Sequence, residues 1–179
     1  DDYLTEAEAY LAACDADDTL PPDSRYEAMR SMLSGEAPTI IKASTAGQIA
    51  TAVAWAKRRG YKIILAGSRD AWRCADLLAK EKVPVIFDGT FDLPARDTDS
   101  HDAHFRAPSI LTKAGVSVSL SPKMGSWAAA IARNLPYAAA HSAAHGFSRA
   151  DALKSITLNP ARALGLGKRL GSLEAGKEA

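Results

Sequence analysis

The chain has 179 residues, of which 47% are hydrophobic and 24% are charged, and its formal net charge is +1. This is the composition of a soluble globular domain that is long enough for one substantial core. Acidic and basic residues are interleaved, which argues against nucleic acid or an anionic membrane as a partner, and the longest apolar runs are too short to span a bilayer. The sequence starts without Met, so we expect a fragment of a longer protein and leave its compartment open.

The sequence of residues 1–37 predicts a helical segment that leads into the rest of the chain. Two helices are expected around a polar, proline-containing loop at 15–23, and nothing in this segment suggests chemistry. The two cysteines, Cys14 and Cys74, lie far apart and outside any CxxC pair, which predicts free thiols and no zinc or redox motif.

From residue 38 onward, short apolar runs alternate with helical patterns. The first run covers residues 39–42 and is followed by a helix over 46–59. Thr45 and Gln48 have the spacing of a capping box, and Gly60 stands where a left-handed helix end is expected.

The next unit has a strand at 62–66 and a helix at 69–80, with Ser68 as the predicted N-cap and Asp70 in the first turn. The third strand is predicted at 83–87.

A polar loop at 88–105 leads to a short helix at 107–114 and a fourth strand at 116–120. Two further helices are predicted at 126–145 and 148–164.

Apolar, β-branched strands that alternate with helices predict an α/β fold with a parallel sheet buried on both faces. Four such βα units make half of a (β/α)₈ TIM barrel, because a full barrel needs about 250 residues. The pattern alone leaves open a small, independent four-stranded sheet.

Several segments add up to a more specific pattern, and the strongest of them lie near the end of the chain. They are Leu93-Pro94-Ala95-Arg96-Asp97, Asn134-Leu135-Pro136-Tyr137, Leu158-Asn159-Pro160-Ala161 and Gly171-Ser172-Leu173-Glu174-Ala175-Gly176-Lys177. From about residue 20 onward, the chain resembles the imidazolonepropionase-like branch of the amidohydrolase superfamily.

The resemblance implies that residues 38–166 supply barrel strands five to eight and that residues 167–179 begin a small β-sandwich beside the barrel. Such enzymes hydrolyse C–N bonds of amides or cyclic amides, and they use zinc or another divalent metal.

In a barrel of this kind, chemistry takes place at the carboxyl ends of the strands. The side chains expected to face a substrate there are Lys42, Ser44, Ser68, Arg69, Asp88, Ser121 and Lys123. The resemblance places metal-binding histidines at positions 42 and 67 and a metal-binding aspartate at position 123. The residues present are Lys42, Gly67 and Lys123, so we expect no metal ligand and no cofactor in this chain.

The four histidines suggest no alternative metal centre. His101 and His104 are interpreted as part of a solvated acidic loop, although imidazole and carboxylate together are ordinary metal ligands. His141 and His145 share one helix face, but no glutamate accompanies them, which favours packing or exposure.

Two functions remain open. One is a fragment of a metal-dependent hydrolase that is inactive alone, and the other is a non-catalytic relative that binds a ligand or a partner subunit. Lys42 is either a salt-bridged replacement for a lost ligand, a contact for an anionic substrate, or a nucleophile. The expected partners are a small-molecule substrate or anion, and either the missing barrel half or a second copy that covers the open strand edges.

Overall fold

The computed structural model describes residues 1–123 and 128–178. Its centre is a sheet of four parallel strands: β1 (Thr39–Lys42), β2 (Ile63–Ala66), β3 (Val85–Phe87) and β4 (Val118–Leu120). The strands lie in the order β1-β2-β3-β4, so each pairs with the next one along the chain. An unbroken sequential order of parallel strands is that of a barrel, and it confirms the α/β half-barrel.

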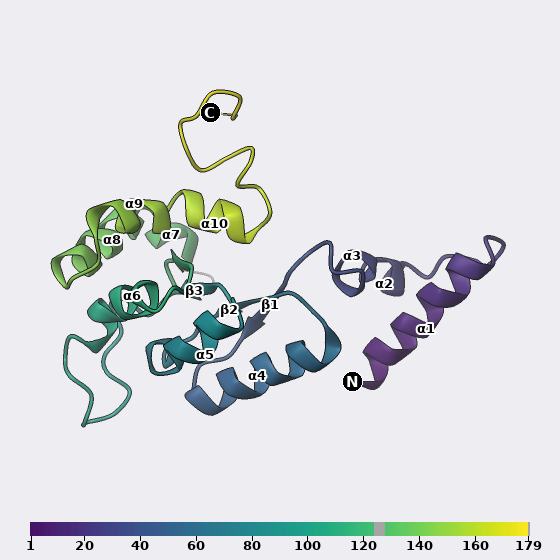
Figure 1. The fold of residues 1–179 in the computed structure, drawn as a ribbon, viewed down its shortest axis with the longest axis horizontal. Helices are drawn as coiled ribbons and strands as arrows, with labels where there is room; N and C mark the ends of the chain where they lie inside the picture. The colour runs from purple at the N-terminus through teal and green to yellow at the C-terminus, as the bar shows by residue number, and fades with distance from the viewer. Residues whose placement is uncertain (124–127, 179) are drawn as a thin grey trace.

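Helices follow the strands as an arc along one side of the sheet (Figure 1). In chain order, α4 (Ala46–Arg59) contacts the 3₁₀ helix η1 (Ala71–Cys74), η1 and α5 (Ala75–Lys80) contact α6 (Ala103–Lys113), and α6 contacts α8 (Leu135–Ala144). The main hydrophobic core lies between this arc and the sheet.

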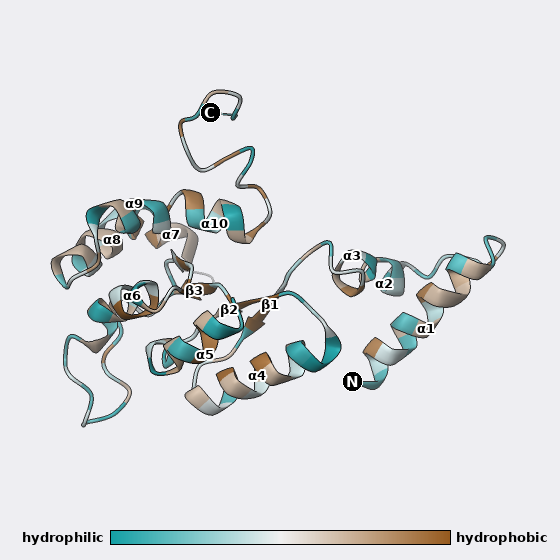
Figure 2. Ribbon diagram, viewed as in Figure 1, coloured by the Kyte–Doolittle hydropathy of each residue, from teal (hydrophilic) through white to brown (hydrophobic). Residues whose placement is uncertain are grey.

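Register assigns the two faces of the sheet. Ile41, Leu65, Val85 and Val118 are paired across the strands and belong to the core under the helices. Lys42 lies in register with Ala66 and therefore shares the opposite face, the interior of the barrel. Figure 2 shows the strands as the most continuously hydrophobic part of the ribbon.

The capping signals of the first βα unit are confirmed. Gln48 N–H donates to Thr45 Oγ1 at 3.4 Å, Gln48 Oε1 accepts from Thr45 N–H at 3.1 Å, and Gly60 has a φ of 72°. These local interactions fix both ends of α4.

The predicted helix at 69–80 is wrong at its start. It divides into η1 and α5, and Ser68 is not its N-cap, because the buried Ser68 hydroxyl lies 3.4 Å from the carbonyl of Ala66. Asp70 precedes η1 but does not cap it, because its carboxylate instead accepts from the N–H of Ala46, the first residue of α4, and from Arg96.

The later helices differ in length from their predictions. The helix predicted at 107–114 begins earlier, as α6, and contains Pro108. Beyond the fourth strand, the start of the helix predicted at 126–145 lies outside the described residues. The rest of that helix is broken into α7 (Ala128–Ile131), η2 (Ala132–Asn134) and α8, with Pro136 in the first turn of α8. The helix predicted at 148–164 is α9 (Arg149–Ser155) and α10 (Leu158–Ala163).

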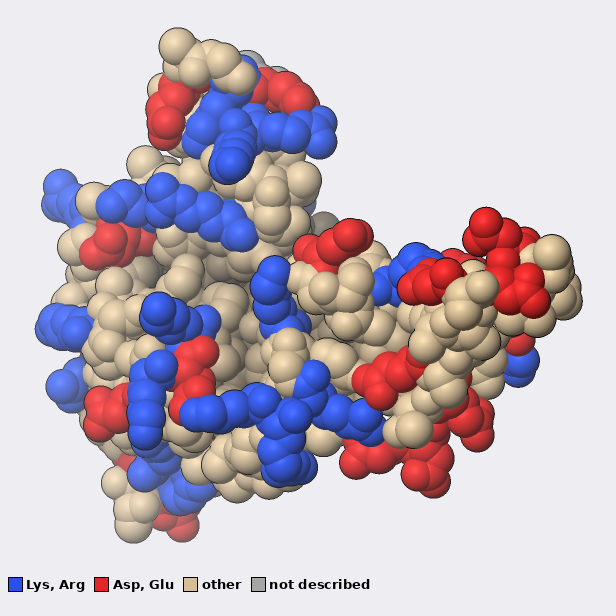
Figure 3. Space-filling view, turned by 45° about the vertical axis from the view of Figure 1, so that its right-hand side comes forward, with Lys and Arg blue, Asp and Glu red and all other residues tan. Residues whose placement is uncertain are grey.

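The two ends of the chain project from this body (Figure 1). The lead-in consists of α1 (Asp2–Ala16) and the single turns α2 (Ser24–Glu27) and α3 (Arg30–Leu33). Figure 3 shows acidic side chains gathered over this part, and Arg59 at the end of α4 binds two of them, Asp1 and Glu8. Residues 167–178 form turns and contain no strand, so they add no strand to the sheet beside β4.

No helix in the described part of the chain combines the length and the apolar character needed to cross a membrane.

Candidate functional site

The carboxyl ends of the four strands lie at one edge of the sheet, where the chain leaves each strand for its loop. Lys42, Gly67, Asp88 and Ser121 are the residues at or just after those ends. The structure brings Asp88, Ser121 and Lys123 together around one pocket. The remaining sequence-predicted site residues occupy different surroundings.

Lys42 reaches across the end of β1 toward the neighbouring strand. A Cβ built on Gly67 would lie 3.1 Å from both Cγ and Cε of Lys42, so the aliphatic part of the lysine fills the space where a side chain at position 67 would begin. Gly67 also has a φ of 63°, a conformation that residues with a Cβ rarely adopt. A side chain at position 67 would therefore strain the backbone and would require the side chain of Lys42 to shift by a few tenths of an ångström.

Ser44, Ser68 and Arg69 do not converge on the pocket. The backbone of Ser44 donates to Gln48 and accepts from Asp70, so it joins the start of α4 to the second βα turn. Ser68 is fully buried. Arg69 is exposed and, in the described structure, its side chain forms no hydrogen bond or ion pair. Ser68 is therefore wrong as a substrate-facing residue, because its hydroxyl points back at its own strand.

The buried carboxylate of Asp70 is the centre of a polar network that includes the exposed side chain of Arg96. The carboxylate accepts two hydrogen bonds from Arg96, at 2.8 and 3.1 Å, and a third from the backbone N–H of Ala46 at 3.2 Å. Arg73 from η1 binds Asp99, which lies with Arg96 on the long loop between β3 and α6. The network joins the turn after β1, the turn after β2 and the loop after β3 into one unit.

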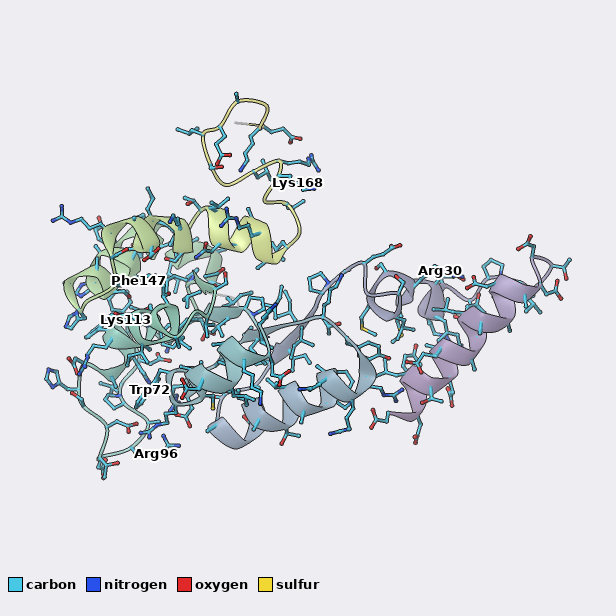
Figure 4. All side chains as sticks on the ribbon, in the orientation of Figure 1. Arg30, Trp72, Arg96, Lys113, Phe147 and Lys168 are labelled. Carbon is cyan, nitrogen blue, oxygen red and sulfur yellow. The ribbon has the colours of Figure 1, made fainter. Side chains whose placement is uncertain are left out.

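The network lowers the pKa of Asp70. Asp70 is only 3% exposed, and the hydrogen bonds from Arg96 are the main reason that the pKa of its carboxyl lies below the ordinary value. Figure 4 shows Arg96 on the long loop and Trp72 from η1 on the same side of the molecule, and the guanidinium of Arg73 lies 4.3 Å from the centre of the Trp72 ring.

Asp88 has the opposite environment. It follows β3, is half-buried, and desolvation is the main cause that raises the pKa of its carboxyl, with the nearby charge of Asp92 adding to the effect. Lys42 and Lys123 act in the other direction on Asp88. Lys123 itself binds Asp92, so its charge is compensated within the site.

His104 holds the loop that carries Asp92. It is 3% exposed, and its Nδ1 lies 2.9 Å from the carbonyl oxygen of Asp92, which requires a proton on Nδ1. The interpretation of His104 as part of a solvated loop is therefore wrong, because α6 begins at Ala103 and carries the ring into the core. His101 is exposed, as expected.

His141 and His145 pack on an aromatic ring. Phe105 stacks on both, with ring centres 5.5 and 4.8 Å apart, and Nδ1 of His145 lies 2.8 Å from the carbonyl oxygen of His141. Within residues 1–123 and 128–178, no three His, Cys, Asp or Glu side chains gather as a metal site. Cys14 and Cys74 are free thiols.

Sequence reasoning missed Thr90, Phe91 and Asn134, which line the pocket with Asp88. No local motif marks them, because they come from a loop and a helix start that are brought together only by the fold.

The comparisons with known proteins agree with this architecture. The model of the amidohydrolase family matches residues 26–179. The chain belongs to the amidohydrolase family.

Among solved structures, the chain is similar to an amidohydrolase from Thermotoga maritima, with 26% identity and a TM-score of 0.82 over 99% of this chain and 47% of that one. A prolidase complexed with N-methylphosphonate-L-proline is 17% identical (TM-score 0.57, 83% of this chain and 38% of that one). A zinc-bound adenosine deaminase from Xanthomonas campestris is 24% identical (TM-score 0.54, 79% and 36%). The last two show the fold alone. No curated protein sequence matches the chain. The chain thus spans about half the length of the T. maritima amidohydrolase.

Proposed function

We propose that this chain is half of a hydrolase barrel that acts on C–N bonds of amides or cyclic amides, and that its strand ends bind substrate without holding a metal. Membership of the amidohydrolase family supports hydrolysis as the general reaction. Four parallel strands in sequential order, spanning 47% of the T. maritima amidohydrolase, support a half-barrel that is completed by further strands.

The observation that carries the proposal is the contact between Lys42 and Gly67. In the family resemblance, both positions belong to metal-binding histidines. An ammonium group is a poor metal ligand and repels a divalent cation, and glycine at position 67 offers no ligand atom, on a left-handed backbone that disfavours a side chain there. At the third ligand position, Lys123 is bound to Asp92. A divalent metal therefore does not fit the residues present at these three positions.

The remaining strand-end groups are suited to binding and orienting a substrate. Lys42 carries a positive charge on the interior face and has no carboxylate partner at ion-pair distance in the described structure, so it is available to an anionic group of the substrate. Asp88 is a half-buried carboxyl with a raised pKa, which is the property of a group that holds a proton or accepts one.

The partner in this proposal is a second barrel half, because β1 and β4 are both edge strands and Ile40 of β1 is 49% exposed. A separate half of the same protein, or a second copy of this chain, has the parallel strands needed to pair with both edges.

The test is elemental mass spectrometry of the full-length protein, purified without chelator, combined with amide hydrolysis assays. We expect Lys42→Ala, Asp88→Asn and Lys123→Ala to leave the metal content per chain unchanged and to lower the hydrolysis rate. Loss of stoichiometric metal in any of these variants would contradict the proposal, because it would assign a metal ligand to this half.

A second candidate is a non-catalytic relative that binds a ligand or a partner subunit. The replacement of all three ligand positions by Lys42, Gly67 and Lys123 favours it. The same experiment separates the two: a full-length protein that holds no metal after incubation with excess zinc and hydrolyses no amide, yet binds a ligand at Asp88, is such a relative.

A further inference from the structure

A small cavity lies beside the strand ends, between the ends of β3 and β4 and the helices that follow β4. Its volume is about 160 Å³. Its lining residues in the described part of the chain are Asp88, Thr90, Phe91, Ser121, Pro122, Lys123, Ile131, Asn134, Leu135 and Ala138. An apolar protein cavity of about 150 Å³ is large enough to bind benzene, whereas sites for whole drug-sized ligands measure about 300–1,000 Å³. This cavity therefore suits one group of a larger ligand.

The wall of the cavity is mostly apolar. Phe91 comes from the loop after β3, Ile131 ends α7, and Leu135 and Ala138 lie on α8. The Oγ1 atom of Thr90 is inaccessible, so the hydroxyl of this residue offers nothing to a ligand. A group that enters this cavity gains free energy chiefly because apolar surface is removed from water.

The charges beside the cavity balance one another. The carboxylates of Asp88 and Asp92 lie near the ammonium groups of Lys42 and Lys123, and Lys123 is bound to Asp92. The hydroxyl of Ser121 donates to the next carbonyl of the chain at 2.8 Å. Desolvation is the main cause that raises the pKa of Asp88, as expected for a carboxyl beside an apolar wall. The balance of charge thus favours an uncharged group over a charged one.

We propose that this cavity is a subsite for an uncharged apolar group of the substrate, of the size of a phenyl ring or a branched alkyl chain. The group packs against Phe91, Ile131 and Leu135, and the polar part of the substrate remains at the strand ends beside Asp88. Asn134 is exposed and stays in contact with water. The role of this group in a substrate rests on the proposed hydrolysis, whereas its binding can be measured without any activity.

The test uses benzene and pyrazine, two uncharged rings of nearly equal size, titrated into the full-length protein. Binding is followed by the NMR shifts of the methyl groups of Ile131 and Leu135, which line the cavity. We expect saturable shifts with benzene and at least tenfold weaker binding of pyrazine. Pyrazine binds more weakly because its two ring nitrogens lose their hydrogen bonds to water when they enter an apolar site.

Phe91→Ala removes one side of the wall. The ring of Phe91 is held edge-to-face against His141, with ring centres 5.1 Å apart, and its loss should weaken benzene binding about tenfold. Phe91 is 54% exposed, so the variant should fold. The matched control is Leu93→Ala, because Leu93 is an exposed apolar residue on the same loop outside the lining. This control should leave the affinity for benzene unchanged.

Ala138→Leu fills the cavity from α8 and should abolish benzene binding. The matched control is Ala140→Leu, the same substitution at an exposed position of the same helix outside the lining. Circular dichroism of both variants checks that they are folded. If Ala138→Leu does not fold, Phe91→Ala and its control decide the question.

Hydrolysis assays separate this inference from the proposed function. If the protein hydrolyses amides, kcat/KM for a substrate with a phenyl or isobutyl group should exceed that for the methyl analogue by at least tenfold, and Phe91→Ala should remove this preference. Hydrolysis without such a preference would contradict the subsite. Benzene binding without any amide hydrolysis would contradict the proposed function and leave the cavity as a site for apolar groups.

Two binding results would overturn the proposal. Equal affinities for pyrazine and benzene would show that the apolar wall does not select the ligand. Benzene binding that shifts neither Ile131 nor Leu135, or that neither Phe91→Ala nor Ala138→Leu weakens, would place the apolar group elsewhere.

Discussion

The strand ends of β1 and β2 differ from those of β3 and β4 in what occupies the space above them. Above β1 and β2, the chain fills its own site: Lys42 covers Gly67, and Asp70 binds Arg96 and the backbone of Ala46. Above β3 and β4, a cavity of about 160 Å³ remains beside Asp88, and the buried hydroxyl of Thr90 has no hydrogen-bond partner among the described residues.

The difference shows that one edge of a sheet can hold a fully hydrogen-bonded polar network next to a region with a cavity and an unpaired buried hydroxyl. Polar groups with all their partners stabilise the first region, and polar groups without partners mark the second. Substitutions in the two regions should therefore have opposite consequences for stability.

The largest effect is expected from Asp70→Ala. The substitution leaves Arg96 and the Ala46 N–H without their acceptor, and we expect the free energy of unfolding to fall by about 2–3 kcal/mol, as measured by urea denaturation. The loop at 88–102 should also become more sensitive to proteolysis, because Arg96 no longer holds it. The matched control is Asp97→Ala, since Asp97 is exposed on the same loop. Equal behaviour of the two variants would show that the Asp70 network contributes nothing.

A smaller effect is expected from Gly67→Ala. The left-handed backbone and the contact with Lys42 should together cost about 1–2 kcal/mol. In a Lys42→Ala background, the contact is gone, and the cost should fall by about 0.5 kcal/mol or more in a double-mutant cycle.

Gly60 provides the control for this cycle. Its φ is 72°, but a Cβ there would meet no atom within 4 Å. Gly60→Ala should therefore lose stability from backbone strain alone, by an amount that Lys42→Ala does not change. If the stability cost of Gly67→Ala is also the same with and without Lys42→Ala, then Lys42 does not fill the space at position 67.

In both regions, features that depend on residues close in the sequence are predicted better than features that depend on distant residues. The strands and the Thr45–Gln48 capping box depend on residues close in the sequence, so pattern and propensity identify them. The predicted helix at 69–80 was wrong at its start, where the Asp70 carboxylate binds Arg96, 26 residues further along the chain. No residue near Ser68 in the sequence argues against Ser68 as the N-cap of that helix.

The candidate site was predicted in part. Asp88, Ser121 and Lys123 were placed by the rule that barrel chemistry lies at strand ends, and they do share a pocket. Thr90 could not be found, since its significance is an absent hydrogen bond, which exists only once the packing around it is known. Ser68 was misplaced because one residue of difference in a turn decides whether a hydroxyl faces the site or its own strand.

The smallest effect concerns pH, and it separates the two regions by sign. Folding lowers the pKa of Asp70, so the stability that Asp70 contributes is present above the unfolded pKa of about 3.9 and is lost as the pH falls below it. Folding raises the pKa of Asp88, so the folded state binds this proton first, and stability falls as the pH rises from about 3.9 through the raised pKa. We expect urea unfolding between pH 3 and 7 to show both effects. In Asp88→Asn, the free energy of unfolding should fall less as the pH rises above 4, and in Asp70→Asn it should fall less as the pH drops below 4.

Asp92→Asn tests the cause of the shift at Asp88, on which Asp92, Lys42 and Lys123 all act. This variant should reduce the fall in stability above pH 4 without removing it, because desolvation is the main cause of the raised pKa and remains in the variant.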